Sequence, residues 1–284
     1  MSQAFDDANL HKIWSYYDRG ESRIGYRYIL GGTKHFGFYG PGQTRWAFTA
    51  AMRRMEDRLG AELALPAGSK VLDAGCGIGN VARAMADRHG LDVTGIDILD
   101  FNIAEANRRS AKAGLTKATR FHIGDYHHLP FPDSSFDGLY TMETFVHSAD
   151  PKAALAEFKR VLKPGGKLVM FEYSRTRDSE VSPEANRAMR RVCDEAAMPA
   201  WLELYHGVLD EMLGAAGFAV ESSVDITANM MPMASAFYLI GKFPFWVGRI
   251  TRLEYKVVNA MSARMMFRYK EAWHYGIHTA VNTD

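Results

Sequence analysis

A glycine-rich turn placed directly after a hydrophobic strand constrains this chain more than any other feature of its sequence. The run Val71–Asn80 reads VLDAGCGIGN, so three glycines alternate with other residues behind a short apolar stretch. Glycines at such a turn let the backbone bend sharply and let a ligand approach without interference from a Cβ atom. The spacing departs from the dinucleotide fingerprint G-x-G-x-x-G at Asn80, where a third glycine or alanine would stand. Asp97 lies 20 residues after Gly77, and an acid there can accept hydrogen bonds from both hydroxyls of a ribose, which predicts an adenosine-containing cofactor.

From this turn onward, strand-like and helix-like segments alternate, a pattern typical of a mostly parallel sheet with helices on both faces. We therefore expect an α/β fold with seven strands, the last two forming an antiparallel hairpin. The expected strands are Lys70–Cys76, Asp92–Ile98, Thr119–Gly124, Phe136–Met142, Lys167–Tyr173, Phe218–Val224 and Trp273–Val281, and the expected helices between them include Asn80–Arg88, Phe101–Ala113 and Pro151–Leu162.

Composition narrows the class of function. The 34 Lys and Arg residues against 33 Asp and Glu leave a net charge of +1, which argues against a nucleic-acid partner because such proteins carry a basic surplus. Cys76 and Cys193 form no zinc-binding spacing and no HExxH motif is present, so we expect no metal and a reducing, cytoplasmic environment. The sequence shows no signal-peptide pattern and no apolar run of about 20 residues, the length of a membrane span. Peripheral membrane contact and a homo-oligomer stay open.

Two segments lie outside the alternating pattern. We expect residues 1–62 to be a helical, aromatic-rich cover for cofactor or substrate, residues 63–226 to be the cofactor-binding core, and residues 272–284 to supply the last strand. Between the last two strands, residues 227–271 hold six of the 15 methionines and predict helices such as Phe245–Phe267. Because Met and aromatic side chains adapt to irregular apolar shapes, we favour a hydrophobic lid over the carboxyl ends of the strands. A buttress on the outer face of the sheet and a subunit interface are the alternatives.

Residues 73–79 (DAGCGIG) resemble motif I of the class I S-adenosylmethionine-dependent methyltransferases. Four further matches follow in the family's order: Asp97, Gly124–Asp125, the pair 129–131 (LPF) and 135–137 (SFD), and residues 160–166 (RVLKPGG). The resemblance implies a Rossmann-like fold and S-adenosylmethionine as the cofactor. It places Asp73, Gly75 and Gly77 at the methionine end, Asp97 at the ribose, Asp125 at the adenine amino group and Tyr126 beside the ring. Ile98 and Thr141 are further cofactor-binding positions.

The segment after the fourth strand points to the acceptor. Residues 140–150 (YTMETFVHSAD) are similar to the strand, Glu, His and Asp pattern of sterol C-24 methyltransferases, whereas residues 35–42 (HFGFYGPG) look more like tocopherol methyltransferases and their small-molecule relatives. The likeness implies a lipophilic acceptor and C-methylation of an isoprenoid; the alternative is O- or N-methylation of an aromatic metabolite such as a quinol, phenol or alkaloid. A cofactor-binding scaffold without catalysis is the rival from another class.

Glu143, His147 and Tyr39 are the catalytic candidates. Glu143 and His147 can act as bases, although a contact to the cofactor for Glu143 and a loop-orienting role for His147 are equally acceptable. Tyr39 belongs to a set of aromatic rings whose faces stabilise a cation. The pair His127–His128 has no carboxylate at ligand spacing, and we interpret it as loop surface.

Overall fold

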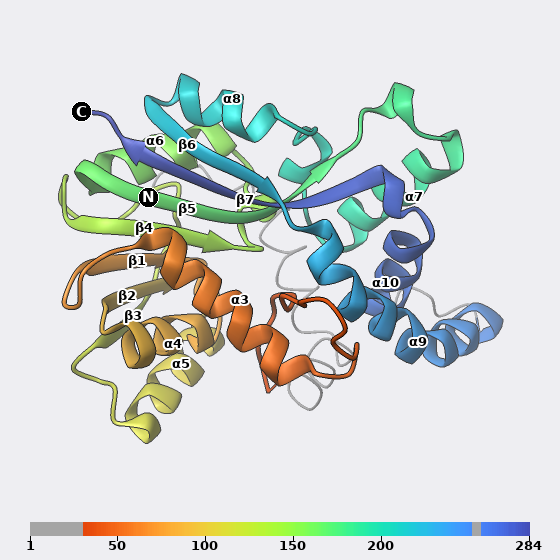
Figure 1. Cartoon of the computed structure of the whole chain (residues 1–284), viewed down its shortest axis with the longest axis horizontal. Coiled ribbons are helices and arrows are strands. Elements are labelled where there is room, and N and C mark those ends of the chain that lie inside the picture. Colours follow the sequence, from red (N-terminus) through yellow and green to blue (C-terminus); the bar gives the residue numbers. More distant parts are fainter. Residues whose placement is uncertain (1–30, 252–256) are drawn as a thin grey trace.

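A seven-stranded sheet organises the computed structural model, which describes residues 31–251 and 257–284 (Figure 1). The strands run in the order β3-β2-β1-β4-β5-β7-β6. All pairs are parallel except those of β7, which runs antiparallel to both β5 and β6. The strand bounds are β1 Lys70–Ala74, β2 Asp92–Asp97, β3 Thr119–Ile123, β4 Phe136–Met142, β5 Leu162–Arg175, β6 Phe218–Asp225 and β7 Trp273–Asn282. The predicted α/β class and the closing antiparallel hairpin are confirmed.

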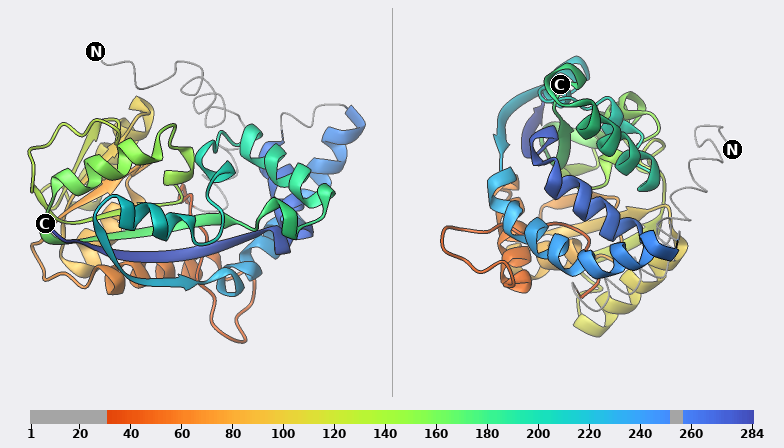
Figure 2. Two further views of the ribbon diagram at one scale, coloured as in Figure 1. Left: turned by 90° about the horizontal axis from the view of Figure 1, so that it is seen from above. Right: turned by 90° about the vertical axis from the view of Figure 1, so that its right-hand side faces the viewer.

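Helices cover both faces of the sheet. The strand order reverses between β1 and β4, and because parallel crossovers are right-handed, the helices on either side of this point lie on opposite faces. On one face are α4 (Asn80–His89) and α5 (Asp100–Ala113), with α3 (Phe48–Leu63) packed against α4. On the other are α6 (Pro151–Val161) and α8 (Val208–Ala215) (Figures 1 and 2). The switch point between β1 and β4 is where open α/β sheets bind ligands.

Local signals set the helix ends close to the expected positions. Gly79 and Gly90 flank α4 with φ of 69° and 68°, a left-handed conformation that favours glycine. At α6, the Asp150 side chain accepts hydrogen bonds from the backbone N–H groups of Lys152 and Ala153, which caps the helix start. The largest difference lies at β5, which is longer at both ends than predicted because it pairs with β4 on one side and β7 on the other.

Residues 227–271 form two helices beyond the carboxyl ends of β4 and β5 (Figure 1). They are α9 (Thr227–Thr251) and α10 (Val258–Arg268), which pack against each other, while α10 also packs against α7 (Pro183–Glu195). Of the predicted helical stretch Phe245–Phe267, residues 245–251 end α9, residues 258–267 lie in α10, and residues 252–256 lie outside the described residues. Helix α9 begins earlier, at Thr227, and continues through Pro232 and Pro244, where a proline normally ends a helix. Of the predicted cover 1–62, residues 1–30 lie outside the described residues. None of the helices in the described part is both long and apolar enough to cross a membrane.

Candidate functional site

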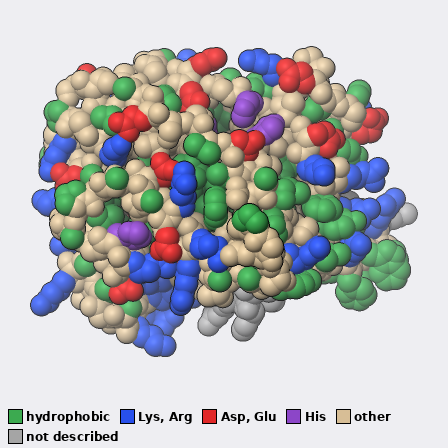
Figure 3. Space-filling model, viewed as in Figure 1, with side chains coloured by type: hydrophobic (Ala, Val, Ile, Leu, Met, Phe, Trp, Pro, Cys, Tyr) green, Lys and Arg blue, Asp and Glu red, His purple; other side chains and the backbone are tan. Residues whose placement is uncertain are grey.

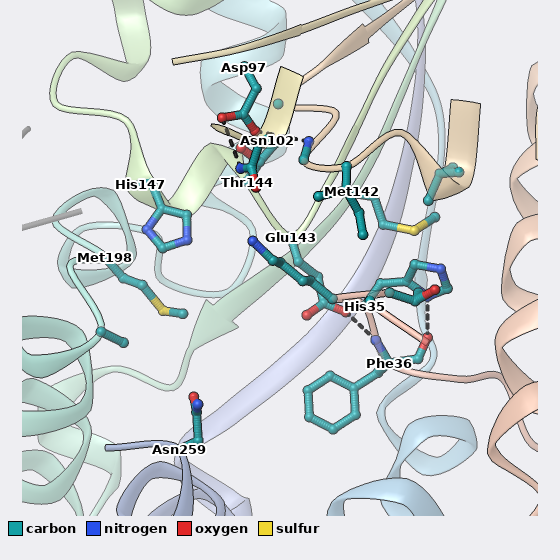
Figure 4. Close-up of a pocket in the computed structure, with 18 of the residues that line it drawn as sticks. His35, Phe36, Asp97, Asn102, Met142, Glu143, Thr144, His147, Met198 and Asn259 are labelled. Carbon is teal, nitrogen blue, oxygen red and sulfur yellow. Dashed lines mark hydrogen bonds between the residues drawn. The ribbon is translucent and has the colours of Figure 1, made fainter. Parts of the chain in front are cut away.

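One continuous cavity of about 460 Å³ opens at the carboxyl ends of the parallel strands, a size usual for small-molecule sites. Its walls come from the glycine turn after β1, the loops after β2 and β4, residues 32–36, and helices α9 and α10. Figure 4 shows Asp97 and Asn102 at one end, Asn259 of α10 at the other, and Glu143 between them. The two ends differ in chemistry: acids and backbone groups surround the first, and mostly apolar side chains surround the second.

The glycine turn is shaped for close approach. Gly75, Gly77 and Gly79 adopt φ of 92°, 52° and 69°, values that disfavour any other residue. A Cβ at Gly75 would lie 2.2 Å from Oγ1 of Thr144, so only glycine fits there. A Cβ at Gly77 would meet nothing within 4 Å among the described residues. Both Gly75 and Gly77 line the cavity, so the turn offers its backbone to a ligand.

Asp97 lies at the end of β2 and ties the glycine turn to the following loop. Its Oδ2 accepts a hydrogen bond from Gly77 N–H at 2.9 Å, and its Oδ1 accepts from Leu99 N–H at 2.8 Å and from the Asn102 side-chain amide at 3.1 Å. A carboxylate has roughly four acceptor positions, so three donors leave capacity for a ligand hydroxyl. Burial raises the pKa of Asp97. Its neighbour Ile98 also lines the cavity.

Asp73 carries a buried carboxyl beside the Tyr140 hydroxyl, and its hydrogen bonding is incomplete. Its Oδ2 accepts no hydrogen bond from the residues that the structure describes, and the side chain lines the cavity. Burial raises the pKa of this carboxyl to about 7. Because an unpaired buried carboxylate is costly, a ligand ammonium group placed here would satisfy it. The residues present therefore fit the amino-acid end of the cofactor that the sequence resemblance implies.

Of the remaining predicted cofactor residues, one lines the cavity and two do not. Tyr126 lines the cavity and its hydroxyl donates to the Thr144 carbonyl at 3.2 Å. Asp125 and Thr141, however, are outside the cavity as the described residues form it. Thr141 is buried within β4, and Asp125 accepts a hydrogen bond from His127 N–H at 2.8 Å and faces its ring Nδ1 at 2.6 Å.

This contact corrects the interpretation of His127 as loop surface, whereas His128 is exposed as expected. His127 is 3% exposed and lies between Asp125 and Ser148, whose Oγ is 2.8 Å from its Nε2. The loop folds back on itself through a bridge between Asp125 and His128. The Asp125 carboxylate is thereby directed to a side chain two residues away, which the residue spacing does not reveal.

Glu143 projects from the end of β4 into the centre of the cavity. Its φ of 56° is left-handed, a conformation that costs roughly 1–2 kcal/mol for a residue with a Cβ. The carboxylate accepts hydrogen bonds from Phe36 N–H at 2.6 Å, from the Tyr275 hydroxyl at 2.9 Å and from the Tyr173 hydroxyl. Burial raises the pKa of Glu143, opposed by these hydrogen bonds. The side chain is therefore held rigidly at the junction of the two ends.

His147, one turn further, lines the cavity opposite Phe36 and beside Met198 (Figure 4). Its Nδ1 lies 2.7 Å from the Ala197 carbonyl oxygen, so this nitrogen must carry the proton that it donates. Burial lowers the pKa of His147 to about 4. The imidazole is therefore neutral near pH 7.

Tyr39, the third catalytic candidate, is placed outside the cavity. It is 2% exposed and packs with Ala51, Met52 and Met233 in a separate apolar cluster. Its hydroxyl donates to the Arg45 carbonyl at 3.1 Å. This placement contradicts a direct role at the reacting atoms, because both the ring and the hydroxyl already have protein partners.

Glu172 shapes the site from outside the cavity and was not predicted from the sequence. Glu172 is 1% exposed and accepts hydrogen bonds from Thr144 N–H at 3.1 Å and Phe145 N–H at 2.8 Å, so it fixes the loop that carries Glu143 and His147. Burial raises the pKa of Glu172 to about 8. In the sequence it was only one residue of the expected strand Lys167–Tyr173, without a role attached.

The far end of the cavity was not predicted residue by residue. It is mainly apolar, and its lining includes Met198, Trp201, Phe237, Ile240, Pro244 and Met266. Asn259 and Ser262 of α10 add polar groups, and the Ser262 hydroxyl is buried without a hydrogen bond to any described residue. Lys34 lines the cavity near the junction, and burial lowers its pKa to about 8. These residues come from distant parts of the chain, so no local motif marks them.

Comparisons with known proteins indicate the family of the chain. The model of a methyltransferase domain family matches residues 72–170. The chain is 35% identical to the S-adenosyl-L-methionine-dependent Diels-Alderase iccD of Talaromyces variabilis, over 96% of both chains. It is 36% identical to the sterol 24-C-methyltransferase ERG6B of Gibberella zeae, over 53% of this chain and 39% of the relative. The crystal structure of the [4+2]-cyclase SpnF superposes with a TM-score of 0.74 at 24% identity and 94% coverage of both chains.

Proposed function

Since the chain belongs to the S-adenosylmethionine-dependent methyltransferase family, we propose that it transfers a methyl group to a carbon atom of a lipophilic, unsaturated small molecule, such as an isoprenoid. The observation that carries this proposal is the continuous cavity, which joins the glycine turn and its acids to an apolar space under α9 and α10. Acceptor and cofactor can therefore meet at Glu143 without water between them.

Different residues of the chain would bind different parts of the cofactor. Asp97 would accept from the ribose hydroxyls, Asp73 would hold the ammonium group, and Ile98 and Tyr126 would lie along the adenine. When bound, the cofactor supplies an electrophilic methyl group on a sulfonium. The buried Asp73 carboxyl, which lines the cavity, supports this orientation.

Carbon is the preferred target because neither of the two bases predicted from the sequence is suited to a hydroxyl or amine. The pKa of His147 is held at about 4, and the Glu143 carboxylate already accepts three hydrogen bonds. Efficient proton transfer needs a base whose pKa is near the working pH. We therefore rank O- or N-methylation of an aromatic metabolite below C-methylation.

An alkene carbon needs no base to attack. Its π pair would form the bond to the methyl carbon, and the carbon–sulfur pair would return to sulfur. The carbocation left behind is a strong acid, so the Glu143 carboxylate suffices to stabilise it and to accept its proton as the alkene reforms. Phe36 and Tyr173, whose ring centroids are 6.3 Å apart, add aromatic faces near the cation.

A cofactor-dependent [4+2] cyclisation without methyl transfer is the second candidate. It is favoured by the relative named a Diels-Alderase, which matches over 96% of both chains, whereas the sterol methyltransferase ERG6B matches over 53% of this one. For this reaction the apolar end of the cavity would fold a conjugated chain upon itself.

Incubation with methyl-labelled S-adenosylmethionine and separate isoprenoid, quinol and conjugated polyene acceptors tests the proposal. We expect a product that gains one labelled methyl on carbon, with one S-adenosylhomocysteine formed per product. Label on oxygen or nitrogen contradicts carbon as the target. A product isomeric with its substrate, formed without consumption of the cofactor, favours cyclisation instead.

A further inference from the structure

Helix α9 exposes an unusual number of large apolar side chains. Of the exposed large hydrophobic residues in the described part of the chain, six lie on this one helix: Leu239, Ile240, Phe243, Trp246, Val247 and Ile250. Phe243 is 71% exposed, Trp246 58% and Ile250 62%. Leu239, Phe243, Trp246 and Ile250 recur at the three- to four-residue spacing that places side chains on one helix face. We call these four residues with Val247 the α9 stripe.

The same helix also forms a wall of the cavity. Gly241 and Pro244 line the cavity, and Gly241 packs closely on Ala260 of α10. Ile240 both lines the cavity and is 38% exposed, so it lies at the rim. The α9 stripe therefore faces outward beside an opening that leads to the apolar end of the cavity.

The charged side chains of α9 and α10 are all basic. Neither α9 nor α10 contains Asp or Glu, whereas Lys242 and Arg249 lie on α9 and Arg264 and Arg268 on α10. Lys242 Nζ is 4.8 Å from the centre of the Tyr238 ring, and the Arg264 guanidinium is 5.0 Å from that of Phe245. Figure 3 shows hydrophobic side chains gathered at the lower right, where α9 lies, with Lys and Arg side chains beside them.

We propose that the α9 stripe docks the protein on the surface of an anionic lipid bilayer. Apolar and aromatic side chains with basic neighbours are what a helix needs to lie in the interfacial plane, and tryptophan is enriched at that depth. Each Lys or Arg near an anionic surface strengthens binding by on the order of fivefold, so the absence of acids on both helices favours lipid over a neutral partner. In this position Ile240 and the rim face the lipid. Entry of a lipophilic acceptor by this route rests on the proposed function; the docking itself does not.

Flotation of the full chain with lipid vesicles tests the docking. Vesicles of phosphatidylcholine alone and of phosphatidylcholine mixed with phosphatidylserine are compared. We expect binding to the mixed vesicles, weakened about tenfold or more by Phe243→Ser with Trp246→Ser, because the docking depends on burial of these side chains. Lys242→Glu with Arg249→Glu should remove the preference for phosphatidylserine. S-adenosylhomocysteine binding, measured on each variant, shows that the fold is retained.

A matched pair of isoleucines provides the control. Ile250 is 62% exposed on α9 and Ile123 is 61% exposed at the end of β3. Ile250→Ser should weaken vesicle binding and Ile123→Ser should not. Equal effects of the two, or no binding of the wild type to either vesicle, overturn the proposal. So does a concentration-dependent dimer abolished by the Phe243 and Trp246 substitutions, which would assign the α9 stripe to a second copy of the chain.

Discussion

The two ends of the cavity are built by different physical means. At the cofactor end, glycines with positive φ shape the turn after β1, and Asp97 ties this turn to the loop after β2 through hydrogen bonds from backbone N–H groups. At the acceptor end, side chains from α7 through α10 are held mainly by apolar contact. Hydrogen bonds demand particular atoms at particular distances, whereas apolar packing tolerates exchange of residues of similar volume. The same cofactor end can therefore be combined with acceptor ends of different shape.

The largest effect should come from Asp97→Ala at the cofactor end. The change removes the acceptors of Gly77 N–H and Leu99 N–H as well as the expected ribose contacts. Because hydrogen bonds to a charged group contribute roughly 1.5–3 kcal/mol each, S-adenosylhomocysteine should bind about tenfold more weakly or worse. Calorimetric titration measures this, with Asp92→Ala at the opposite end of β2 as the control. An unchanged dissociation constant in a folded Asp97→Ala protein would remove Asp97 from the site.

Substitutions at the junction should separate the two ends. Glu143→Gln keeps an acceptor for Phe36 N–H but removes the charge that stabilises a developing cation, and His147→Asn removes the ring beside Met198. Turnover should fall about tenfold or more, in line with loss of a transition-state contact, with little change in cofactor affinity. If affinity for S-adenosylhomocysteine falls in proportion to turnover, the substituted residue belongs to the cofactor end.

The protonation of Asp73 offers a test by pH. Its pKa of about 7 in the free protein is raised above the ordinary value by burial, and an ammonium ligand requires the ionised form. Between pH 6 and pH 8 the affinity for S-adenosylhomocysteine should therefore rise by roughly tenfold, as expected when binding selects one form of a single group. Asp73→Asn cannot ionise and should show only the pH dependence of the ligand. An identical pH profile in the two proteins would contradict the contact.

We expect a smaller effect at the acceptor end, where ligand binding should protect the backbone amides of α9 and α10 from hydrogen exchange. If these helices act as a lid, adding S-adenosylhomocysteine with a lipophilic acceptor should slow exchange in them by several-fold, because ligand binding stabilises the closed form. The strands β1 and β4 provide an internal reference. Protection that ignores both ligands would leave α9 and α10 as a static wall.

The contrast also explains what could be predicted from the sequence. The order of strands and helices followed from glycine turns, capping residues and alternating patterns, which act over a few residues. Glu143 and His147 were found because they directly follow β4, where the fold places its sites.

The sequence was least informative where contacts that no local pattern records decide where a side chain lies. Tyr39 was selected for its aromatic ring, yet its packing on Met233 of α9 turns it away from the cavity. Asp125 is expected at the cofactor, and its contact with the His127 ring could not be predicted from the sequence. The role of Glu172 depends on loop N–H groups 27 and 28 residues away, which no local spacing records.

We propose that a cofactor and a lipophilic acceptor share one cavity and meet beside Glu143. A crystal structure determined with S-adenosylhomocysteine and a bromine-substituted fatty alcohol tests it most directly, because anomalous scattering locates the bromine. We expect S-adenosylhomocysteine at the glycine turn, with its ribose on Asp97, and the bromine among Met198, Phe237 and Met266. Bromine bound outside the cavity, or S-adenosylhomocysteine bound away from the glycine turn, would contradict it.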